Sequence, residues 1–238
     1  MDCLKTTLAY YSHWLGAPPE AAQSVFLPAR DESVPGYSAP FHLYIFAAPG
    51  YTALSYGLRA RPGIHALLPR LAAGMEEAIV QTYGISPGHS VKFFLRAAPS
   101  SPSIPARALT LTDEAAYLSF FAQANGCSAD DWVSEYFGDM VQDGMCFGVF
   151  ENGILASCTD GPTMPFMANA VREIGIHTLP AFRGRGYARA ACAACIHSLL
   201  SRNFCPIWSA GAENIASRRL AESLGFAPLA DVYTLSLP

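Results

Sequence analysis

A glycine- and arginine-rich hexapeptide is the stretch of this sequence best suited to chemistry. It reads RGRGYA from Arg183 to Ala188, between an expected strand that ends at Pro180 and an expected helix. Gly184 and Gly186 lack a Cβ atom, so another molecule can approach the backbone closely there. The first turn of the following helix presents unpaired N–H groups and the positive end of the helix dipole. With the two arginines, this arrangement predicts an anion site suited to phosphate or pyrophosphate.

Two common phosphate-binding loops do not match this stretch. The Walker pattern GxxxxGK[ST] is absent, and the dinucleotide pattern GxGxxG fails because its sixth position, counted from Gly184, is Arg189. The pattern [RQ]xxGx[GA] does fit, with Arg183, Gly186 and Ala188 at its defined positions. In this respect the hexapeptide resembles the acetyl-CoA loop of the GNAT N-acetyltransferase superfamily.

The surroundings of the loop strengthen the resemblance. Thr178, Leu179 and Pro180 form a corner before it that is similar to the family's VxP corner. A segment similar to the family's NxxAxxLYxxxGF follows it, with Asn214, Ser217, Leu220, Ala221, Gly225 and Phe226 at the matching positions. The expected order β-α-α-β-β-β-α-β-α-β-β over residues 104 to 238 is also the family's order. The resemblance does not extend to residues 1 to 100.

The resemblance implies acetyl-CoA, or another acyl-CoA, as co-substrate. It places the pantetheine arm along the strand before the loop and the pyrophosphate on the loop. The residues that it implies as cofactor contacts are Ile176, His177, Thr178, Arg183, Gly184, Arg185, Gly186, Tyr187, Ala188, Asn214 and Ser217. It also implies direct attack of a neutral amine on the thioester, with a backbone donor such as that of Thr178 stabilising the oxyanion.

The proton donor for the departing thiolate is an open question in the sequence. The family places a tyrosine where this chain has Ala221. Ser217 lies one turn earlier on the same helix face, and Tyr233 lies on the last expected strand. Either hydroxyl, or water, could supply the proton.

The base that removes the proton from the amine has three candidates. Glu173 opens the strand before the loop, near where the family often keeps a glutamate, but one position out of register. A shift of one residue turns a side chain to the other face of a sheet. His177 lies on the same strand, and histidine is the side chain that most often serves as a general base in enzymes. Glu213, beside Asn214, is the third candidate.

The division of the chain follows from a linker-like stretch. Residues 97 to 108 read AAPSSPSIPARA, and their prolines and serines are typical of a linker. The prediction is therefore residues 1 to 100 as a smaller N-terminal α/β domain and residues 104 to 238 as the acyl-CoA-binding domain. The expected fold class is α/β (α+β), a GNAT fold with a mixed twisted sheet and flanking helices.

The first 100 residues carry periodic patterns but no recognisable catalytic motif. A helix is expected over 4–15, two β runs around Pro49 and Gly50, a helical stretch over 64–79 that Pro69 kinks or breaks, and a strand over 91–97. This part could be a degenerate half of a GNAT-like domain or a lid over the acceptor site. In the second part, Thr112 and Ser128 are expected helix N-caps, and Asn152-Gly153 predicts a hairpin.

The composition excludes several other classes of protein. Of 238 residues, 51% are hydrophobic and 14% are charged, which is a globular composition. A net charge of −4 argues against a duplex nucleic-acid binder. No apolar stretch reaches the roughly 18 residues of a membrane span, and the amino-terminal stretch does not resemble a signal peptide, so a cytoplasmic protein without a membrane partner is expected. The seven scattered cysteines predict reduced, packed thiols rather than disulfides or a metal site.

Two functions stay open from the sequence. The first is an N-acetyltransferase that acts on a small-molecule or peptide amine. The second is a catalytically degenerate GNAT-fold module that binds acyl-CoA as a sensor. A homodimer is compatible with either, and the identity of the acceptor is not readable from the sequence.

Overall fold

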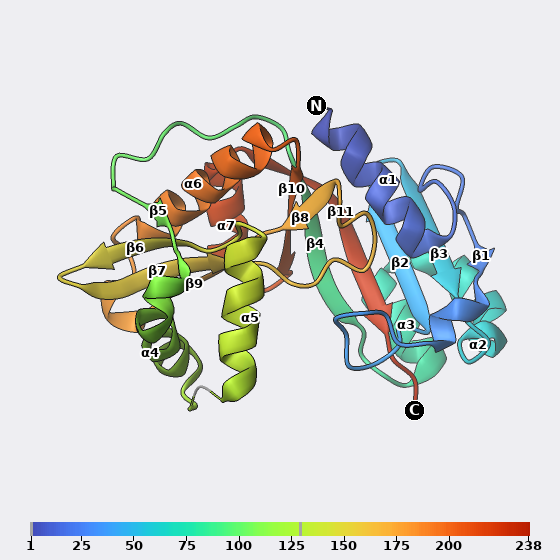
Figure 1. The fold of residues 1–238 in the computed structure, drawn as a ribbon. Coiled ribbons are helices and arrows are strands. Elements are labelled where there is room, and N and C mark those ends of the chain that lie inside the picture. Colours follow the sequence, from blue (N-terminus) through green and yellow to red (C-terminus); the bar gives the residue numbers. More distant parts are fainter. Residues whose placement is uncertain (1, 129) are drawn as a thin grey trace.

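A computed structural model describes residues 2–128 and 130–238, which form two sheets with helices on their faces (Figure 1). Within these residues the larger sheet has seven strands, in the order β1-β3-β2-β11-β4-β10-β8, and the smaller has four, in the order β5-β6-β7-β9. Parallel and antiparallel pairs both occur in the larger sheet. The predicted mixed sheet with flanking helices is therefore confirmed.

The elements have the following bounds. The strands are β1 Val25–Phe26, β2 Leu43–Ala48, β3 Tyr51–Tyr56, β4 Gly88–Leu95, β5 Arg107–Ala108, β6 Phe147–Glu151, β7 Ile154–Asp160, β8 Val171–Glu173, β9 Gly175–Thr178, β10 Cys205–Gly211 and β11 Phe226–Leu235. The helices are α1 Cys3–Leu15, α2 Arg61–Leu67, α3 Met75–Tyr83, α4 Glu114–Asn125, α5 Asp131–Gln142, α6 Tyr187–Ser201 and α7 Ile215–Ser223. Short 3₁₀ turns are η1 Pro28–Asp31, η2 Leu68–Ala73, η3 Leu111–Asp113 and η4 Pro180–Phe182.

The larger sheet takes strands from both sides of the linker-like stretch. β4, which precedes residues 97–108, pairs with β10 and β11, which follow them. β2 also pairs with β11. Residues 97–106 form a loop that passes over α6, and Arg107–Ala108 form β5 (Figure 1). The stretch does not separate two sheets, because strand pairing crosses it.

The expected strand over residues 171–179 divides between the two sheets. β8 pairs in parallel with β10, and β9 pairs antiparallel with β7. The last contact of this segment with β10 is the hydrogen bond from Ile174 N to Ile207 O, at 3.2 Å. Beyond it β9 diverges from β10, so β9 ends the smaller sheet with one edge unpaired by any described strand. This splay positions the candidate site.

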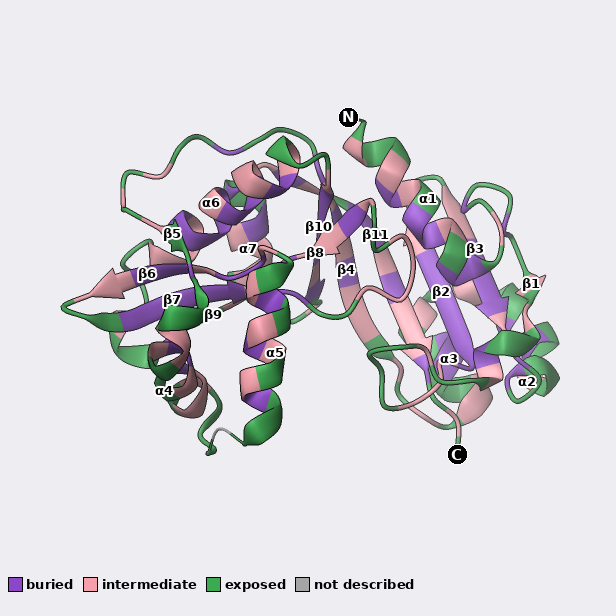
Figure 2. Cartoon of the chain, in the orientation of Figure 1, coloured by how far each residue is buried: buried purple, intermediate pink, exposed green. Residues whose placement is uncertain are grey.

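Helices cover both faces of the larger sheet, and many residues between the layers are coloured as buried in Figure 2. α1 packs on one face, where Tyr11 and Trp14 meet Tyr44 and Phe46 of β2. The opposite face is covered by α2 and α3 over β2, and by α6 and α7 over β4 and β10. Among the described helices, α1 is the one that covers this side of the strands that carry the site, together with loop residues that include Phe41 and Phe166.

The predicted break of the helical stretch over 64–79 at Pro69 is confirmed: α2 and α3 are separated by η2, which contains Pro69, because proline cannot donate the helical hydrogen bond. Two other local expectations are corrected by the structure. Thr110, not Thr112, caps the turn before α4, in a capping box with Asp113. Asp130, not Ser128, is the N-cap of α5.

Candidate functional site

The backbone of the loop between β9 and α6 is open to a ligand. Gly184 and Gly186 have φ values of 75° and 82°, the left-handed region that favours glycine. No atom lies within 4 Å of a Cβ placed on Gly184. The first backbone hydrogen bond into α6 runs from Ala190 N to Gly186 O, at 3.0 Å. The N–H groups of the helix's first turn thus remain available, and these residues fit the pyrophosphate of a CoA thioester.

The two arginines of the loop have different surroundings. Arg185 binds both carboxylate oxygens of Glu151, at 2.9 and 3.0 Å, and the Tyr187 hydroxyl donates to the same carboxylate at 2.5 Å. Arg183 forms no ion pair with any described residue, and its Nε donates to Thr178 O at 3.3 Å. Arg183 is therefore the cation of the loop whose charge remains uncompensated.

The unpaired edge of β9 presents backbone groups just before the loop. Leu179 N donates to Ala156 O at 3.0 Å, and hydrogen-bonded pairs alternate along an antiparallel ladder. Leu179, His177 and Gly175 therefore bond to β7, while the N–H and C=O groups of Ile176 and Thr178 point to the free edge. This edge fits the amide groups of a pantetheine arm.

His177 projects away from the splay between β9 and β10. Its side chain is about half exposed, and its Nε2 lies 3.9 Å from Asp160 Oδ2. With Asp160 it lines a cavity of about 40 Å³ beside α4. Burial raises the pKa of the Asp160 carboxyl, and the neighbouring His177 acts against that rise. The structure therefore does not bring His177 together with Glu173.

Glu173 lies on the face of the larger sheet that α1 covers. The Ser209 hydroxyl donates to Glu173 Oε1 at 2.7 Å, and Lys92 Nζ donates to Ser209 Oγ at 3.0 Å. Both charged residues line a cavity of about 160 Å³ between α1 and the sheet. Burial lowers the pKa of Lys92, and the nearby Glu173 partly offsets this. The candidate base thus sits in a cavity, at the end of β8, where the sheet divides.

Asn214 and Ser217 both have structural contacts at the start of α7. The side chain of Asn214 caps the helix, as predicted, and accepts from Ser217 N at 3.1 Å. The Ser217 hydroxyl accepts from Trp208 Nε1 at 3.1 Å, which leaves its own proton free to be donated. Ala221, at the family's tyrosine position, is fully buried. The roles of Asn214 and Ser217 as cofactor contacts remain predictions.

Tyr233 is separated from Glu173 by the sheet. Its ring stacks on His89 with centroids 4.2 Å apart and packs with the cluster under α2 and α3. Its neighbour Thr234, which must face the other side of the strand, lines the Glu173 cavity. The two predicted catalytic residues Tyr233 and Glu173 are therefore on opposite faces.

Sequence reasoning missed the contribution of the first 100 residues. Lys92 and six aromatic side chains from this part line the Glu173 cavity. A lysine within the apolar run VKFFL was the one available signal, because a charged side chain in a strand of a packed sheet needs a polar partner.

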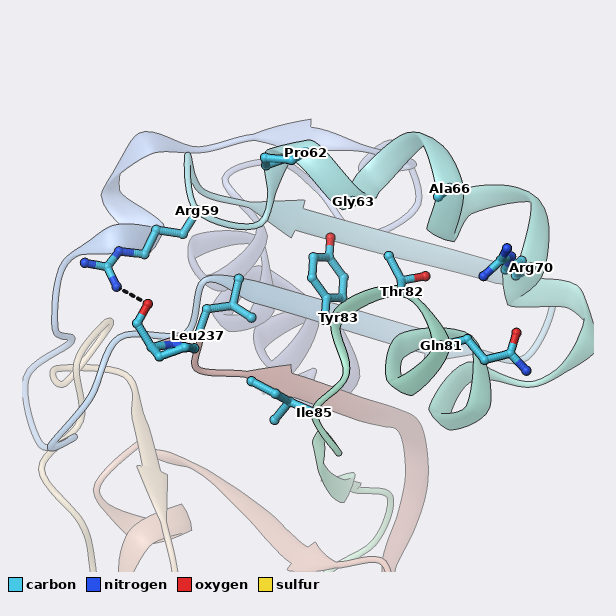
Figure 3. Close-up of a pocket in the computed structure, with 11 residues that line it drawn as sticks. Arg59, Pro62, Gly63, Ala66, Arg70, Gln81, Thr82, Tyr83, Ile85 and Leu237 are labelled. Carbon is cyan, nitrogen blue, oxygen red and sulfur yellow. Dashed lines mark hydrogen bonds between the residues drawn. The ribbon is translucent and has the colours of Figure 1, made fainter.

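A larger cavity of about 790 Å³ lies beside α2 and α3 (Figure 3). Its lining includes Arg59 and Arg70 but, among the described residues, no aspartate, glutamate or histidine. It therefore offers no side-chain base for an amine. Among the described residues, no group of three or more histidine, cysteine, aspartate or glutamate side chains could hold a metal ion. In the same part of the chain, no helix is long and apolar enough to cross a membrane.

Comparisons with known proteins agree with this geometry. Residues 124–234 match the model of the GNAT acetyltransferase family. No curated protein is similar enough in sequence to count as a relative. A GNAT-family acetyltransferase from Colwellia psychrerythraea is 16% identical, with a TM-score of 0.53; the match covers 63% of this chain and only 56% of that one. A GCN5-related N-acetyltransferase from Sphaerobacter thermophilus is 16% identical, with a TM-score of 0.54 over 77% of this chain and 70% of that one.

At this identity, the structural matches establish the fold alone. They agree with the family model, and the matched segment contains the divided strand, the glycine loop and the open start of α6. Residues 124–234 of this chain therefore match the GNAT acetyltransferase family, and the structure has the fold of its solved members.

Proposed function

We propose that this protein is an acyl-CoA-dependent N-acyltransferase that transfers an acetyl group to an amine. The observation that carries the proposal is one continuous segment, residues 175–189, in which the free edge of β9 leads directly to the open N-terminus of α6. A pantetheine arm and a pyrophosphate need these two kinds of backbone surface in this order.

The chain's own groups divide the binding between them. The N–H groups of the loop and of the first turn of α6 hold the pyrophosphate, and Arg183 adds a positive charge. The N–H and C=O groups of Ile176 pair with the pantetheine amides, and the N–H of Thr178 stabilises the oxyanion. Acetyl-CoA, when bound, supplies the acetyl group as a thioester.

Glu173 is the residue best placed to accept the proton of the amine. The Ser209 hydroxyl holds Oε1, while Oε2 makes no hydrogen bond to the described residues. The carboxylate is therefore oriented with one oxygen free. His177 faces Asp160 instead, and Tyr233 lies behind the sheet, so neither shares this position. Ser217 keeps a hydroxyl proton for the departing thiolate, with water as the alternative donor.

One observation favours a second function, an acyl-CoA-binding module without turnover. Ala221 is fully buried where the family resemblance leads us to expect a tyrosine. Alanine cannot donate a proton. The protonation of the departing thiolate, which the family resemblance assigns to this position, must therefore come from another group or has been lost.

Two measurements on the purified chain test these proposals. Calorimetry with acetyl-CoA measures binding, and release of free thiol in the presence of a panel of primary amines measures transfer. Binding with amine-dependent thiol release is expected. Binding without release on any amine would favour the module, and absence of binding would contradict both functions.

A further inference from the structure

The cavity at Glu173 has an aromatic wall contributed by the first 44 residues. Tyr10, Tyr11 and Trp14 come from α1, Tyr37 and Phe41 from the loop before β2, and Tyr44 from β2 itself. Aromatic rings offer large rigid surfaces to an apolar or aryl group. This wall therefore suits a ligand with an apolar side chain.

The opposite part of the lining carries two charges of opposite sign. Lys92 of β4 lies across from Ser209 of β10, and Ser209 bonds to Glu173 of β8. The ammonium and the carboxylate are thus separated by a single hydroxyl group, on three adjacent strands. Burial lowers the pKa of Lys92. The carboxylate of a ligand beside the ammonium would act in the opposite direction and raise this pKa.

A buried arginine fixes part of the aromatic wall. Arg30 is 4% exposed, and its guanidinium lies 4.9 Å from the ring centre of Tyr44 and 5.6 Å from that of Trp14. Its Nε donates to Ser55 Oγ at 2.8 Å. Because these ring faces already hold one cation and Lys92 is a second, the cavity disfavours a ligand that is only cationic.

The volume of the cavity limits the size of the ligand. At about 160 Å³ it is close to the cavity of roughly 150 Å³ that holds a benzene molecule in another protein. A volume of this order suits the apolar or aryl side chain of one small ligand.

We propose that this cavity is the acceptor site, and that the acceptor is a small zwitterion of the α-amino acid class with an apolar or aryl side chain. Its ammonium lies at Glu173 and its carboxylate at Lys92. This inference rests on the proposed acyltransferase function. Glu173 belongs to the strand that continues into β9, so the nitrogen lies at the end of the cavity closest to the free edge.

The transfer balances with the groups named. The acceptor ammonium loses one proton to Glu173, and the neutral nitrogen forms a bond to the acetyl carbon while the C–S bond breaks. The second proton leaves the nitrogen through water, the departing thiolate takes up one proton from Ser217 or water, and Glu173 releases its proton to solvent. The products are an N-acetyl amino acid and the free thiol of CoA.

Calorimetry with matched ligands tests the class of acceptor. One set is L-phenylalanine, phenethylamine without the carboxylate, and 3-phenylpropanoate without the ammonium; the second set is L-leucine, 3-methylbutylamine and 4-methylpentanoate. In at least one set, we expect the amino acid to bind at least about tenfold more tightly than either of its two analogues. Each analogue lacks one charged group and therefore loses the charge-assisted hydrogen bond that this group would make. Equal or tighter binding of the amine would overturn the inference.

Two variants of the chain identify the charges. Lys92→Met should abolish the preference for the amino acid over the amine that lacks the carboxylate. Glu173→Gln should abolish the preference for the amino acid over the acid that lacks the ammonium. Lys5→Met is the matched control, because Lys5 is the other lysine of the sequence and is exposed. Unchanged acetyl-CoA affinity and melting temperature show that each variant is folded.

The outcomes separate this inference from the proposed function. If neither set binds while other amines are acetylated, the acceptor class is wrong and the acyltransferase stands. If an amino acid binds with the Lys92-dependent preference but acetyl-CoA does not bind, the acyltransferase is wrong and the ligand class of the cavity stands.

Discussion

Lys92 Nζ lies 3.0 Å from Oγ of Ser209, its register partner across the β4–β10 pair. This contact joins a residue of the first 100 to a strand of the segment that matches the GNAT acetyltransferase family. The amino-terminal part therefore supplies a wall of the candidate acceptor cavity and the strands β1 to β4 of the shared sheet. A lid that covers the site from outside, which the sequence left open, would not need such pairing.

The loop arginines should differ in their effect on acetyl-CoA binding. Arg183→Ala should weaken binding about ten- to a hundredfold, because it removes the charge that no described carboxylate compensates. Arg185→Ala should have a smaller effect, since Glu151 already binds that guanidinium. Added salt should weaken wild-type binding more than that of Arg183→Ala. Calorimetry at low and high salt measures the affinities and their salt dependence, and Arg70→Ala, at an exposed position, is the control. If both loop variants bind acetyl-CoA as tightly as the wild type does, the hexapeptide is only a turn and not a phosphate-binding loop.

Gly184 gives a cleaner steric test of the loop than Gly186. A Cβ at Gly186 meets Ile104 Cδ1 at 3.3 Å, so a substitution there also disturbs the protein's own packing. A Cβ at Gly184 meets nothing within 4 Å and would point into the space proposed for the pyrophosphate. Gly184→Ala should therefore abolish measurable acetyl-CoA binding in a folded protein.

The control for that substitution is Gly84→Ala at the end of α3. Gly84 has a φ of 71°, near the 75° of Gly184, and also has no atom within 4 Å of an added Cβ. Both variants should lose about 1–2 kcal/mol of unfolding free energy to backbone strain. Only Gly184→Ala should lose affinity, and equal affinities in the two variants would contradict the loop assignment.

The role of Glu173 as base predicts a separation of binding from turnover. Glu173→Gln keeps the size of the side chain and its contact with Ser209 but cannot take up the proton. The rate of acetyl transfer should fall about a hundredfold or more, while acetyl-CoA affinity stays unchanged. His177→Gln should change the rate far less, because His177 faces Asp160. Glu76→Gln, on the exposed face of α3, is the control; a wild-type rate in Glu173→Gln would remove Glu173 as the base.

The parts of the site that sequence analysis predicted are local in the chain. The glycine loop, the start of α6 and the Asn214 cap each depend on residues within a few positions of one another. Their glycine, arginine and asparagine types reveal the backbone conformation or the charge directly. Such features can be identified without knowing which strands pair.

The parts that were missed depend on strand pairing. Lys92 is 81 residues from Glu173, and only the order β4-β10-β8 brings them together. The divided strand was equally hidden, because residues 171–178 continue one β-like pattern across Ile174, where the partner changes from β10 to β7. Periodicity reports which face of a strand is buried but not which neighbour the strand has.

Asp113 should make the stability of the protein depend on pH in the acid range. Arg107 binds both of its carboxylate oxygens, at 2.6 and 2.8 Å, and Arg107, followed by Thr110, holds the pKa of this carboxyl well below its usual range. Because the pKa of Asp113 is lower in the folded protein than in the unfolded chain, its ionised form stabilises the fold. This stabilisation is fully present above the pKa of the unfolded chain, about 3.9, and is lost as the pH falls toward the lower pKa of the folded protein. Asp113→Asn should therefore lower the unfolding free energy by up to about 1 kcal/mol at pH 7, because the neutral amide loses the ionic contact with Arg107. Denaturant titrations should show this difference shrinking below about pH 4; a difference constant down to pH 2 would contradict the pairing.

The cysteines should divide by reactivity into those at the surface and those in the core. Burial raises the pKa of the Cys192 thiol, and with Cys146 and Cys158 it is buried in the cluster under α6. A hydrogen bond from the Cys205 thiol lowers the pKa of the half-buried Cys3 to about 7. In the native protein, iodoacetamide should therefore modify Cys3 and the exposed Cys127, and the rate at Cys3 should rise through pH 7 and then level off, because only the thiolate reacts.

Mass spectrometry of peptides after brief labelling measures each site separately. The buried thiols should react only after unfolding, and acetyl-CoA binding should persist in reductant and chelator. Rapid native labelling of Cys192, or a loss of binding on chelation that zinc restores, would show that the cysteines are not simply packing residues. A rate at Cys3 that keeps rising up to pH 9 would contradict the contact with Cys205, because an unperturbed thiol titrates near 8.5.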